Sequence, residues 1–128
     1  MTKNELEAYI QSAFGISPDH PFARYPDISV FRHPGNRKWF AAQMTVPKTT
    51  LGIKEDGMTD IVNVKCDPEV LRSFLGQPGI YPAYHMNRNH WLTVVLDSAP
   101  DGRADNGTME FLLGISYDLT KEKKKAVR

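Results

Sequence analysis

The sequence predicts an α+β fold, a two-layer sandwich in which an antiparallel sheet is backed by helices. The first observation is the order of its patterns: a helical segment, three strand-like segments, a helix, a strand and a last helix. The second is the length of 128 residues, which fits one domain. The third is a composition of 41% hydrophobic and 24% charged residues, typical of a soluble globular protein. We expect the domain at residues 1–119 and a basic tail at residues 120–128.

The first helix is predicted from its start signal and its apolar stripe. Thr2 and Glu5 form the T-x-x-E pattern of a capping box, in which each side chain accepts from the other residue's backbone N–H. Apolar residues then repeat at helical spacing: Leu6, Tyr9, Ile10, Ala13 and Phe14. Gly15 suits the left-handed conformation that ends a helix. The loop at 17–27 contains three prolines, which disfavour regular structure, and its aromatic side chains are expected to fold back on the sheet.

Two strands, at residues 28–33 and 38–46, are predicted to form a hairpin around a turn at 34–37. In the second strand, strict alternation places one set of side chains on one face, namely Phe40, Ala42, Met44 and Val46. The other face then carries Trp39, Ala41, Gln43 and Thr45. The tip of the hairpin is rich in basic and imidazole side chains, which are Arg32, His33, Arg37 and Lys38.

A long polar connection at 47–60 separates this hairpin from a third strand at 61–66. Fourteen residues exceed the usual loop length in a compact domain, and such loops are often functional or mobile. The third strand ends at Cys66, which is expected to be a small buried apolar side chain rather than a nucleophile. Because a single cysteine cannot form an internal disulfide, the sequence favours a reducing, cytoplasmic location.

The second half of the chain supplies two helices and a central strand. Asp67 is a suitable N-cap for the second helix. The strand at 91–96 has apolar side chains on both faces, so we expect it inside the sheet. A last helix is expected to begin at Asn106 or Thr108. Gly114 lies within that helix and is expected where the helix presses on the sheet.

The net charge of +1 is unevenly distributed. From Thr120 to Arg128 there are five bases and one acid, a net of +4, whereas the remaining chain has eleven bases and fourteen acids, a net of −3. A basic tail is either a solvated chain end or an arm that contacts nucleic acid, and both alternatives stay open. No apolar run is long enough to span a membrane, and the N-terminus lacks the core of a signal peptide, so no membrane association is expected.

Five segments resemble the MmcQ/YjbR family. They are Val30-Phe31, Asn63 to Pro68, Pro82 to Asn87, His90-Trp91 through Leu96-Asp97, and Ser116-Tyr117-Asp118-Leu119. The resemblance covers residues 1–119. It implies a bacterial domain whose antiparallel sheet, backed by helices, is similar in outline to the frataxin (CyaY-like) fold. It also implies a "double-wing" architecture that contacts DNA, and it supplies no catalytic residues and no cofactor.

The first functional hypothesis is therefore binding of double-stranded DNA through two wings. One wing is the hairpin tip and the other is the connection at 47–60, with further donors between them. Basic side chains are required because neutralising phosphates provides most of the affinity and makes it salt-dependent. The candidate residues are Arg32, Arg37, Lys38, Lys48, Lys54, Arg88 and His90. The acidic body counts against this hypothesis, and solvated hairpin residues are the alternative.

The second hypothesis is a binding module for a small molecule or a protein partner. The segment from Tyr84 to Trp91 combines ring-bearing and polar side chains that could line an apolar pocket. The candidate residues are Tyr81, Tyr84, His85 and Trp91, together with His90. The alternative is that the aromatic rings are core and that the histidines satisfy backbone groups.

We expect no enzymatic activity and no cofactor. His85 and His90 lie five residues apart across a turn with no further Cys or His close by, whereas catalytic zinc requires about three protein ligands. Neither a phosphate-binding Gly-rich loop nor a nucleophile elbow is present. An iron site by analogy with frataxin is not favoured, because Glu5 and Glu7 point to different faces of the first helix.

Overall fold

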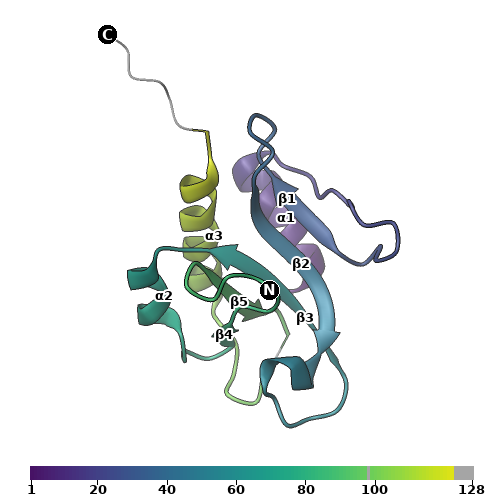
Figure 1. Ribbon diagram of the computed structural model, residues 1–128, viewed down its shortest axis with the longest axis vertical. Coiled ribbons are helices and arrows are strands. Elements are labelled where there is room, and N and C mark those ends of the chain that lie inside the picture. The colour runs from purple at the N-terminus through teal and green to yellow at the C-terminus, as the bar shows by residue number, and fades with distance from the viewer. Residues whose placement is uncertain (98, 123–128) are drawn as a thin grey trace.

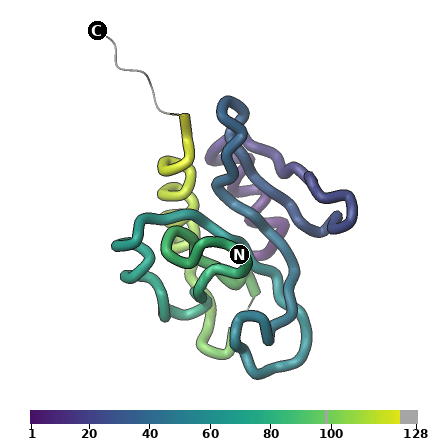
Figure 2. Tube along the Cα trace, in the orientation of Figure 1, coloured from purple at the N-terminus to yellow at the C-terminus, as the bar shows by residue number. Residues whose placement is uncertain are grey.

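An antiparallel sheet with the strand order β1-β2-β3-β5-β4 forms one layer of the protein, and helices form the other. The computed structural model describes residues 1–97 and 99–122. Its elements are α1 (Lys3–Phe14), β1 (Ser29–Arg32), β2 (Trp39–Pro47), the 3-10 helix η1 (Lys48–Leu51), β3 (Met58–Lys65), α2 (Pro68–Phe74), β4 (Ile80–Pro82), β5 (Trp91–Val95) and α3 (Asn106–Thr120). The predicted α+β sandwich is confirmed. Figure 1 shows α1 and α3 behind the sheet, and Figure 2 traces the same path.

The start of α1 follows its sequence signal. The Thr2 side chain accepts from the Glu5 backbone N–H at 3.1 Å, and the Glu5 carboxylate accepts from the Thr2 N–H at 2.9 Å. Gly15 ends the helix with φ of 69°, a left-handed conformation that glycine adopts at little cost. Asp105 caps α3 in a similar way, accepting from the Thr108 N–H at 2.7 Å.

The main core lies between the helices and one face of the sheet. Leu6 and Ile10 of α1 and Leu112 and Leu113 of α3 are fully buried against this face. The strands contribute Phe31, Phe40, Ala41, Val62, Val64, Leu92 and Val94 to the same cluster. β5 lies between β3 and β4 and is apolar on both faces, so the expected interior position of this strand is confirmed.

A β-bulge at the start of β2 changes which side chains share a face. Phe31 pairs with Ala41 but Arg32 pairs with Trp39, so Phe40 is an extra residue in the ladder. Phe40 is consequently buried with Ala41 in the main core. Trp39 lies instead on the opposite face, with Ala42, Met44 and Val46. The expectation of strict alternation along this strand is therefore wrong at its first two residues.

Two further elements differ from the expectation. β4 has three residues, too few for a periodic pattern to indicate a strand, and it pairs with β5 through Ile80 and Val94. β3 begins at Met58 rather than at residue 61, since its polar start extends the ladder with β2. Thr45 Oγ1 donates to Asp60 Oδ1 at 2.6 Å, which satisfies a polar pair within that extension.

Gly114 does not lie where α3 presses on the sheet. A Cβ atom at this position would meet no other group within 4 Å, so the glycine is not required for close approach. Within the described residues, none of the helices has the length and apolar character needed to cross a membrane.

Candidate functional site

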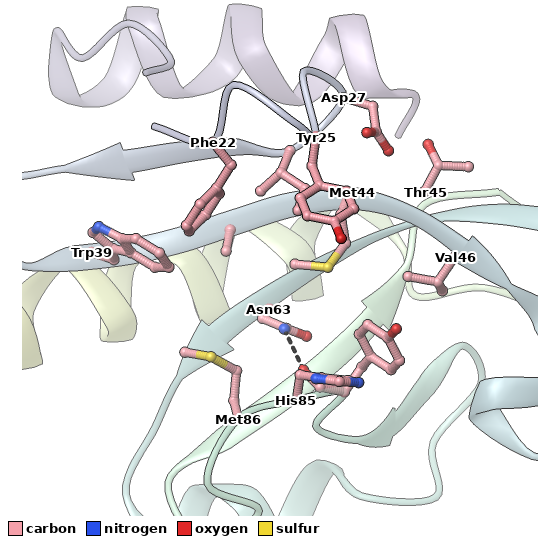
Figure 3. A pocket seen from close by; sticks show the side chains of 13 residues that line it. Phe22, Tyr25, Asp27, Trp39, Met44, Thr45, Val46, Asn63, His85 and Met86 are labelled. Atoms are coloured by element: carbon pink, nitrogen blue, oxygen red, sulfur yellow. Dashed lines mark hydrogen bonds between the residues drawn. The ribbon is translucent and has the colours of Figure 1, made fainter. Parts of the chain in front are cut away.

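A pocket of about 530 Å³ lies on the face of the sheet that α1 and α3 leave uncovered (Figure 3). Its floor is formed by the open face of β2 and by Asn63 of β3. The loop at 17–28 forms one wall, and the loop at 83–90, which joins β4 to β5, forms the other. The residues that line it are Phe22, Tyr25, Asp27, Ile28, Trp39, Ala42, Met44, Thr45, Val46, Asn63, Tyr84, His85 and Met86.

Aromatic rings make up much of both walls. Phe22 packs edge-on against Trp39 with ring centroids 6.0 Å apart, so the predicted return of the loop aromatics onto the sheet is confirmed. On the other wall, the ring centroids of Tyr84 and His85 lie 4.2 Å apart. Phe22 and Tyr25 nevertheless remain 40% and 59% exposed. Large apolar surface left open to solvent over a cavity is typical of a binding site.

Buried hydrogen bonds fix the second wall to the floor. Asn63 is fully buried, and its amide donates to the backbone carbonyl oxygen of Tyr84 at 2.9 Å. Its oxygen accepts from the Thr93 hydroxyl at 2.5 Å. The Thr93 oxygen in turn accepts from the Tyr84 backbone N–H at 2.8 Å. The backbone of Tyr84 is thus held on both sides, which positions its ring before any ligand arrives.

His85 has an unusual backbone conformation at the same wall. Its φ is 55°, a left-handed value that costs a non-glycine residue roughly 1–2 kcal/mol. Conformations of this kind persist where surrounding contacts enforce them, and they concentrate at functional sites. The network at Tyr84 supplies such contacts, and the result is that His85 turns toward the pocket (Figure 3).

Two of the polar side chains inside the pocket are already engaged. Asn63 uses its amide as described, and the Thr45 hydroxyl donates to Asp60. Asp27 is exposed at the rim. Among the lining residues, all of which the structure describes, Asp27 is the single residue with a full charge. The arrangement can hold an apolar or aromatic body, with one carboxylate available at its edge.

Metal-ligating groups and the single cysteine were compared with the position of the pocket. Over residues 1–97 and 99–122 there is no group of three or more His, Cys, Asp or Glu placed to hold a metal ion. Cys66 is buried on the other face of the sheet, in the main core. Burial, with a smaller effect from Asp67, raises the pKa of its thiol to about 11, which opposes nucleophilic use.

The structure brings together two of the five residues proposed for a ligand pocket. Tyr84 and His85 line it. Tyr81 packs in a smaller cluster beside Tyr84 and donates its hydroxyl to Asp101 at 2.9 Å. Burial, followed by that hydrogen bond, raises the pKa of Tyr81 to about 12. Trp91 is half-buried at the start of β5, paired with Lys65, and is not among the lining residues.

The opposite wall and most of the floor were not predicted as a site. Phe22 and Tyr25 were expected to pack on the sheet, but no pattern indicated which strand they would reach. Trp39 was assigned to the wrong face because a bulge cannot be seen in an alternating pattern. A Trp at the start of a strand, preceded in sequence by a loop rich in aromatics, is the signal that could have indicated this wall.

The proposed phosphate-binding residues are not brought together. Arg32 and Arg37 at the first wing both face Asp19, as ion pairs with its carboxylate, and the Arg37 distance is 3.8 Å. The hydrogen bond from Arg32 holds the pKa of Asp19 below its ordinary value. At the second wing, Lys48 pairs with Glu55 at 3.2 Å. These cations are therefore partly neutralised by local carboxylates.

The two wings also lie at opposite ends of β2. The hairpin tip precedes Trp39 and η1 follows Pro47, so the nine residues of β2 separate them (Figure 1). The expected convergence of their cations is wrong, because the long strand holds the wings apart. Lys38, Lys54 and His90 are exposed, and Arg88 donates to the Ala83 carbonyl oxygen at 3.3 Å. Of the proposed tail, residues 123–128 lie outside the described residues.

Comparison with known proteins gives one family. The YjbR family model matches residues 4–119 of this chain. The chain is 34% identical over 122 residues to "Uncharacterized protein YyaQ" of Bacillus subtilis strain 168. That similarity covers 94% of this chain and 99% of the relative.

Solved structures of similar proteins have the same fold. A crystal structure of a Pseudomonas syringae protein superposes with a TM-score of 0.88 at 39% identity, covering 94% of this chain and all of the other. A solution NMR structure from the same organism gives 0.86 at 37% identity, covering 99% of this chain and 98% of the other. Deinococcus radiodurans protein DR2400, described as a DUF419 domain, gives 0.63 at 27% identity over 92% of this chain and 77% of that one. None of these descriptions states an activity or a ligand.

Proposed function

Because this chain belongs to the YjbR family, whose descriptions above state no activity, we propose a function from its own pocket: the protein binds a small organic ligand on the open face of its sheet. The observation that carries the proposal is a cavity of about 530 Å³ lined by aromatic side chains from two loops. Small-molecule sites usually enclose about 300–1,000 Å³ and combine apolar walls with a few placed polar groups. The function proposed is binding rather than catalysis.

The preorganised wall supports this proposal. A binding site whose side chains are already held in place binds its ligand more tightly, since little conformational entropy is then lost on binding. The Asn63, Thr93 and Tyr84 hydrogen bonds hold one wall in this way. The opposite wall offers the exposed rings of Phe22 and Tyr25 to a ligand.

A fragment screen by two-dimensional amide NMR tests the proposal. We expect at least one fragment to shift the amide signals of Tyr25, Met44 and His85 and to raise the melting temperature, since a ligand that binds the native state stabilises it. Tyr25→Ala should weaken that binding because it removes an exposed ring from the wall. Phe111→Ala is the matched control, since Phe111 is a similarly exposed ring on α3. The proposal would be contradicted if no fragment shifted the amide signals of the pocket residues. It would also be contradicted if the Tyr25→Ala variant bound the fragment as tightly as the unsubstituted protein.

A second candidate function is contact with double-stranded DNA at the hairpin tip. One observation favours it: Asn36 donates from its side-chain amide to the Thr120 carbonyl oxygen at 2.8 Å. The exposed Arg37 and Lys38 therefore lie beside the point at which the basic sequence after Thr120 begins. Cations from the hairpin and from this terminal sequence would together neutralise phosphates, without any contribution from the second wing.

Fluorescence anisotropy with a labelled duplex tests this candidate. Binding should weaken as salt rises, and the double variant Arg37→Gln and Lys38→Gln should reduce the slope of log affinity against log salt by about 2. Arg72→Gln, an exposed change on α2, is the control and should leave the slope unchanged. Absence of binding at low salt, or a slope that the double variant does not alter, would exclude this function.

A further inference from the structure

We propose that the ligand of the pocket is an organic cation, with an aromatic or alkyl body held between the walls and its positive group facing Asp27. The inference rests on the proposed ligand-binding function and adds the chemical class of the ligand. The charge of the lining residues and their aromatic rings support it.

The charge of the lining residues is negative. Asp27 is the charged residue of the described pocket lining, which includes neither lysine nor arginine. Within the part of the chain that the structure describes, Asp27 takes part in no salt bridge, whereas Asp19 pairs with Arg32 and Arg37 and Glu55 pairs with Lys48. Figure 3 shows Asp27 and Thr45 at the same end of the pocket. The carboxylate of Asp27 is therefore free to receive a positive group from a ligand.

A second carboxylate lies behind Thr45. The Thr45 hydroxyl donates to Asp60 Oδ1 at 2.6 Å, and the backbone N–H of Asp60 faces Asp97 Oδ2 at 3.3 Å. Two further acids thus follow Asp27 beyond Thr45, and the pocket lining includes no lysine or arginine to oppose them. A ligand that carried a carboxylate or a phosphate would be repelled there.

Two of the side-chain donors on the lining are occupied by bonds within the protein. The Asn63 amide donates to the Tyr84 carbonyl oxygen, and the Thr45 hydroxyl donates to Asp60. The aromatic rings of Tyr25, Trp39 and Tyr84 line the cavity. The face of an aromatic ring attracts a cation by about 0.5–2 kcal/mol, depending on how far the pair is shielded from water. The aromatic rings and the Asp27 carboxylate at the rim therefore both favour a positively charged ligand.

The size of the pocket agrees with a flat body of one or two rings. The cavity of about 530 Å³ extends from the Phe22 and Trp39 pair at one end to Asp27 and Thr45 at the other (Figure 3). Met44 and Met86 contribute polarisable sulfur atoms that pack well against ring edges. The body of the ligand would lie over Met44 with its charged end at the solvent-exposed rim.

Three probes of nearly equal size and shape test the sign of the charge. They are benzamidine, a cation; benzamide, its neutral analogue; and benzoate, an anion. Each is titrated into ¹⁵N-labelled protein, and the dissociation constant is taken from the shifts of the Tyr25, Met44 and His85 amides. We expect benzamidine to bind at least about fivefold more tightly than benzamide, and benzoate to bind most weakly.

Substitution at the rim tests the position of the charge. Asp27→Asn keeps the size of an exposed side chain and should weaken benzamidine binding by about threefold to fivefold, with benzamide binding unchanged. Asp118→Asn makes the same chemical change on the exposed surface of α3 and should leave both constants unchanged. Amide spectra of both variants verify that the fold is retained.

The outcomes separate this inference from the proposed function. Equal binding of the three probes at the pocket, or a preference for benzoate, would overturn the cation class while leaving a ligand-binding pocket in place. Benzamidine affinity that is the same in Asp27→Asn would likewise overturn it. If no probe shifts the pocket amides, the cation inference fails, and the fragment screen above decides separately whether the pocket binds anything.

Discussion

Asn63 and Tyr84 are joined across the floor and wall of the pocket, because the buried Asn63 amide donates to the Tyr84 carbonyl oxygen at 2.9 Å. The residues belong to β3 and to the loop that joins β4 to β5, 21 positions apart in the sequence. The bond therefore couples the stability of the sheet to the geometry of the proposed ligand site.

Asn63→Ala should lower the free energy of unfolding by about 2 kcal/mol, since it leaves the Tyr84 carbonyl and the Thr93 hydroxyl without their partner. Urea denaturation followed by circular dichroism measures the loss. Amide exchange at Tyr84 should also become faster, because its N–H donates to Thr93 at 2.8 Å within the same network. Asn89→Ala, at an exposed turn position, is the control and should change stability by no more than about 0.5 kcal/mol. An Asn63 variant as stable as this control would show that the network contributes nothing.

Ser116 is predicted to be the strongest single polar link between α3 and the sheet. Its buried hydroxyl donates to the Phe40 carbonyl oxygen at 2.5 Å and accepts from the Lys65 N–H at 2.8 Å. Ser116→Ala would leave the Phe40 carbonyl and the Lys65 N–H without a hydrogen-bond partner. We therefore expect urea denaturation to show a free energy of unfolding lower by about 2–3 kcal/mol.

Ser73→Ala is the matched control for that change. Ser73 is also a helical serine, but it is exposed and donates within α2, to the Glu69 carbonyl oxygen at 3.0 Å. Its substitution should be nearly neutral. Equal effects of the two substitutions would mean that the link at Ser116 is not stabilising.

Local signals account for the parts of the fold that were predicted. The capping box at Thr2 and the apolar stripe that follows it depend only on neighbours within one or two turns, and α1 was predicted from them. The two-faced apolar pattern at 91–95 likewise indicated an interior strand. β4 was not predicted, because a segment of three residues forms a strand only when a longer strand, here β5, supplies the hydrogen bonds.

The candidate site was predicted only in half, for a related reason. Tyr84 and His85 lie in the polar, aromatic segment from Tyr84 to Trp91 for which a ligand pocket was predicted, whereas Trp39 reaches the pocket through the bulge at Phe40. That bulge is stabilised by contacts from distant segments: Ser116 satisfies the Phe40 carbonyl, and Phe14 and Tyr117 pack on its ring. No pattern within β2 contains this information, so the face of Trp39 required the tertiary structure.

Gly114→Ala should stabilise the protein by about 0.5–1 kcal/mol, seen as a higher melting temperature. Gly114 lies inside α3, where alanine loses less backbone entropy on folding, and a Cβ there meets nothing within 4 Å. Gly79→Ala is the contrasting variant, since φ is +77° and its Cβ would lie 2.9 Å from the Arg103 Cα. It should destabilise the protein. A Gly114 variant that melts at a lower temperature would contradict the open space seen around this residue.

His33 should make stability depend on pH in the acid range. It is only 4% exposed, and its Nε2 lies 2.9 Å from Thr120 Oγ1. Since the Thr120 hydroxyl donates to the Ser116 carbonyl oxygen at 2.7 Å, its oxygen accepts from His33, which places the proton of the neutral ring on Nε2. Burial is the main cause that lowers the pKa of His33 in the folded protein.

The sign of the effect follows from that lowered pKa. The unfolded chain takes up a proton at His33 near the ordinary pKa of about 6.5, whereas the folded protein resists protonation until a lower pH. The free energy of unfolding should therefore fall as pH decreases below about 6.5, by at most about 1.4 kcal/mol per pH unit from this residue. His33→Gln removes the titrating group, so its unfolding free energy should fall less between about pH 7 and pH 5. Urea denaturation at stepped pH measures both slopes, and identical slopes would show that His33 is protonated as readily in the folded state as in the unfolded chain.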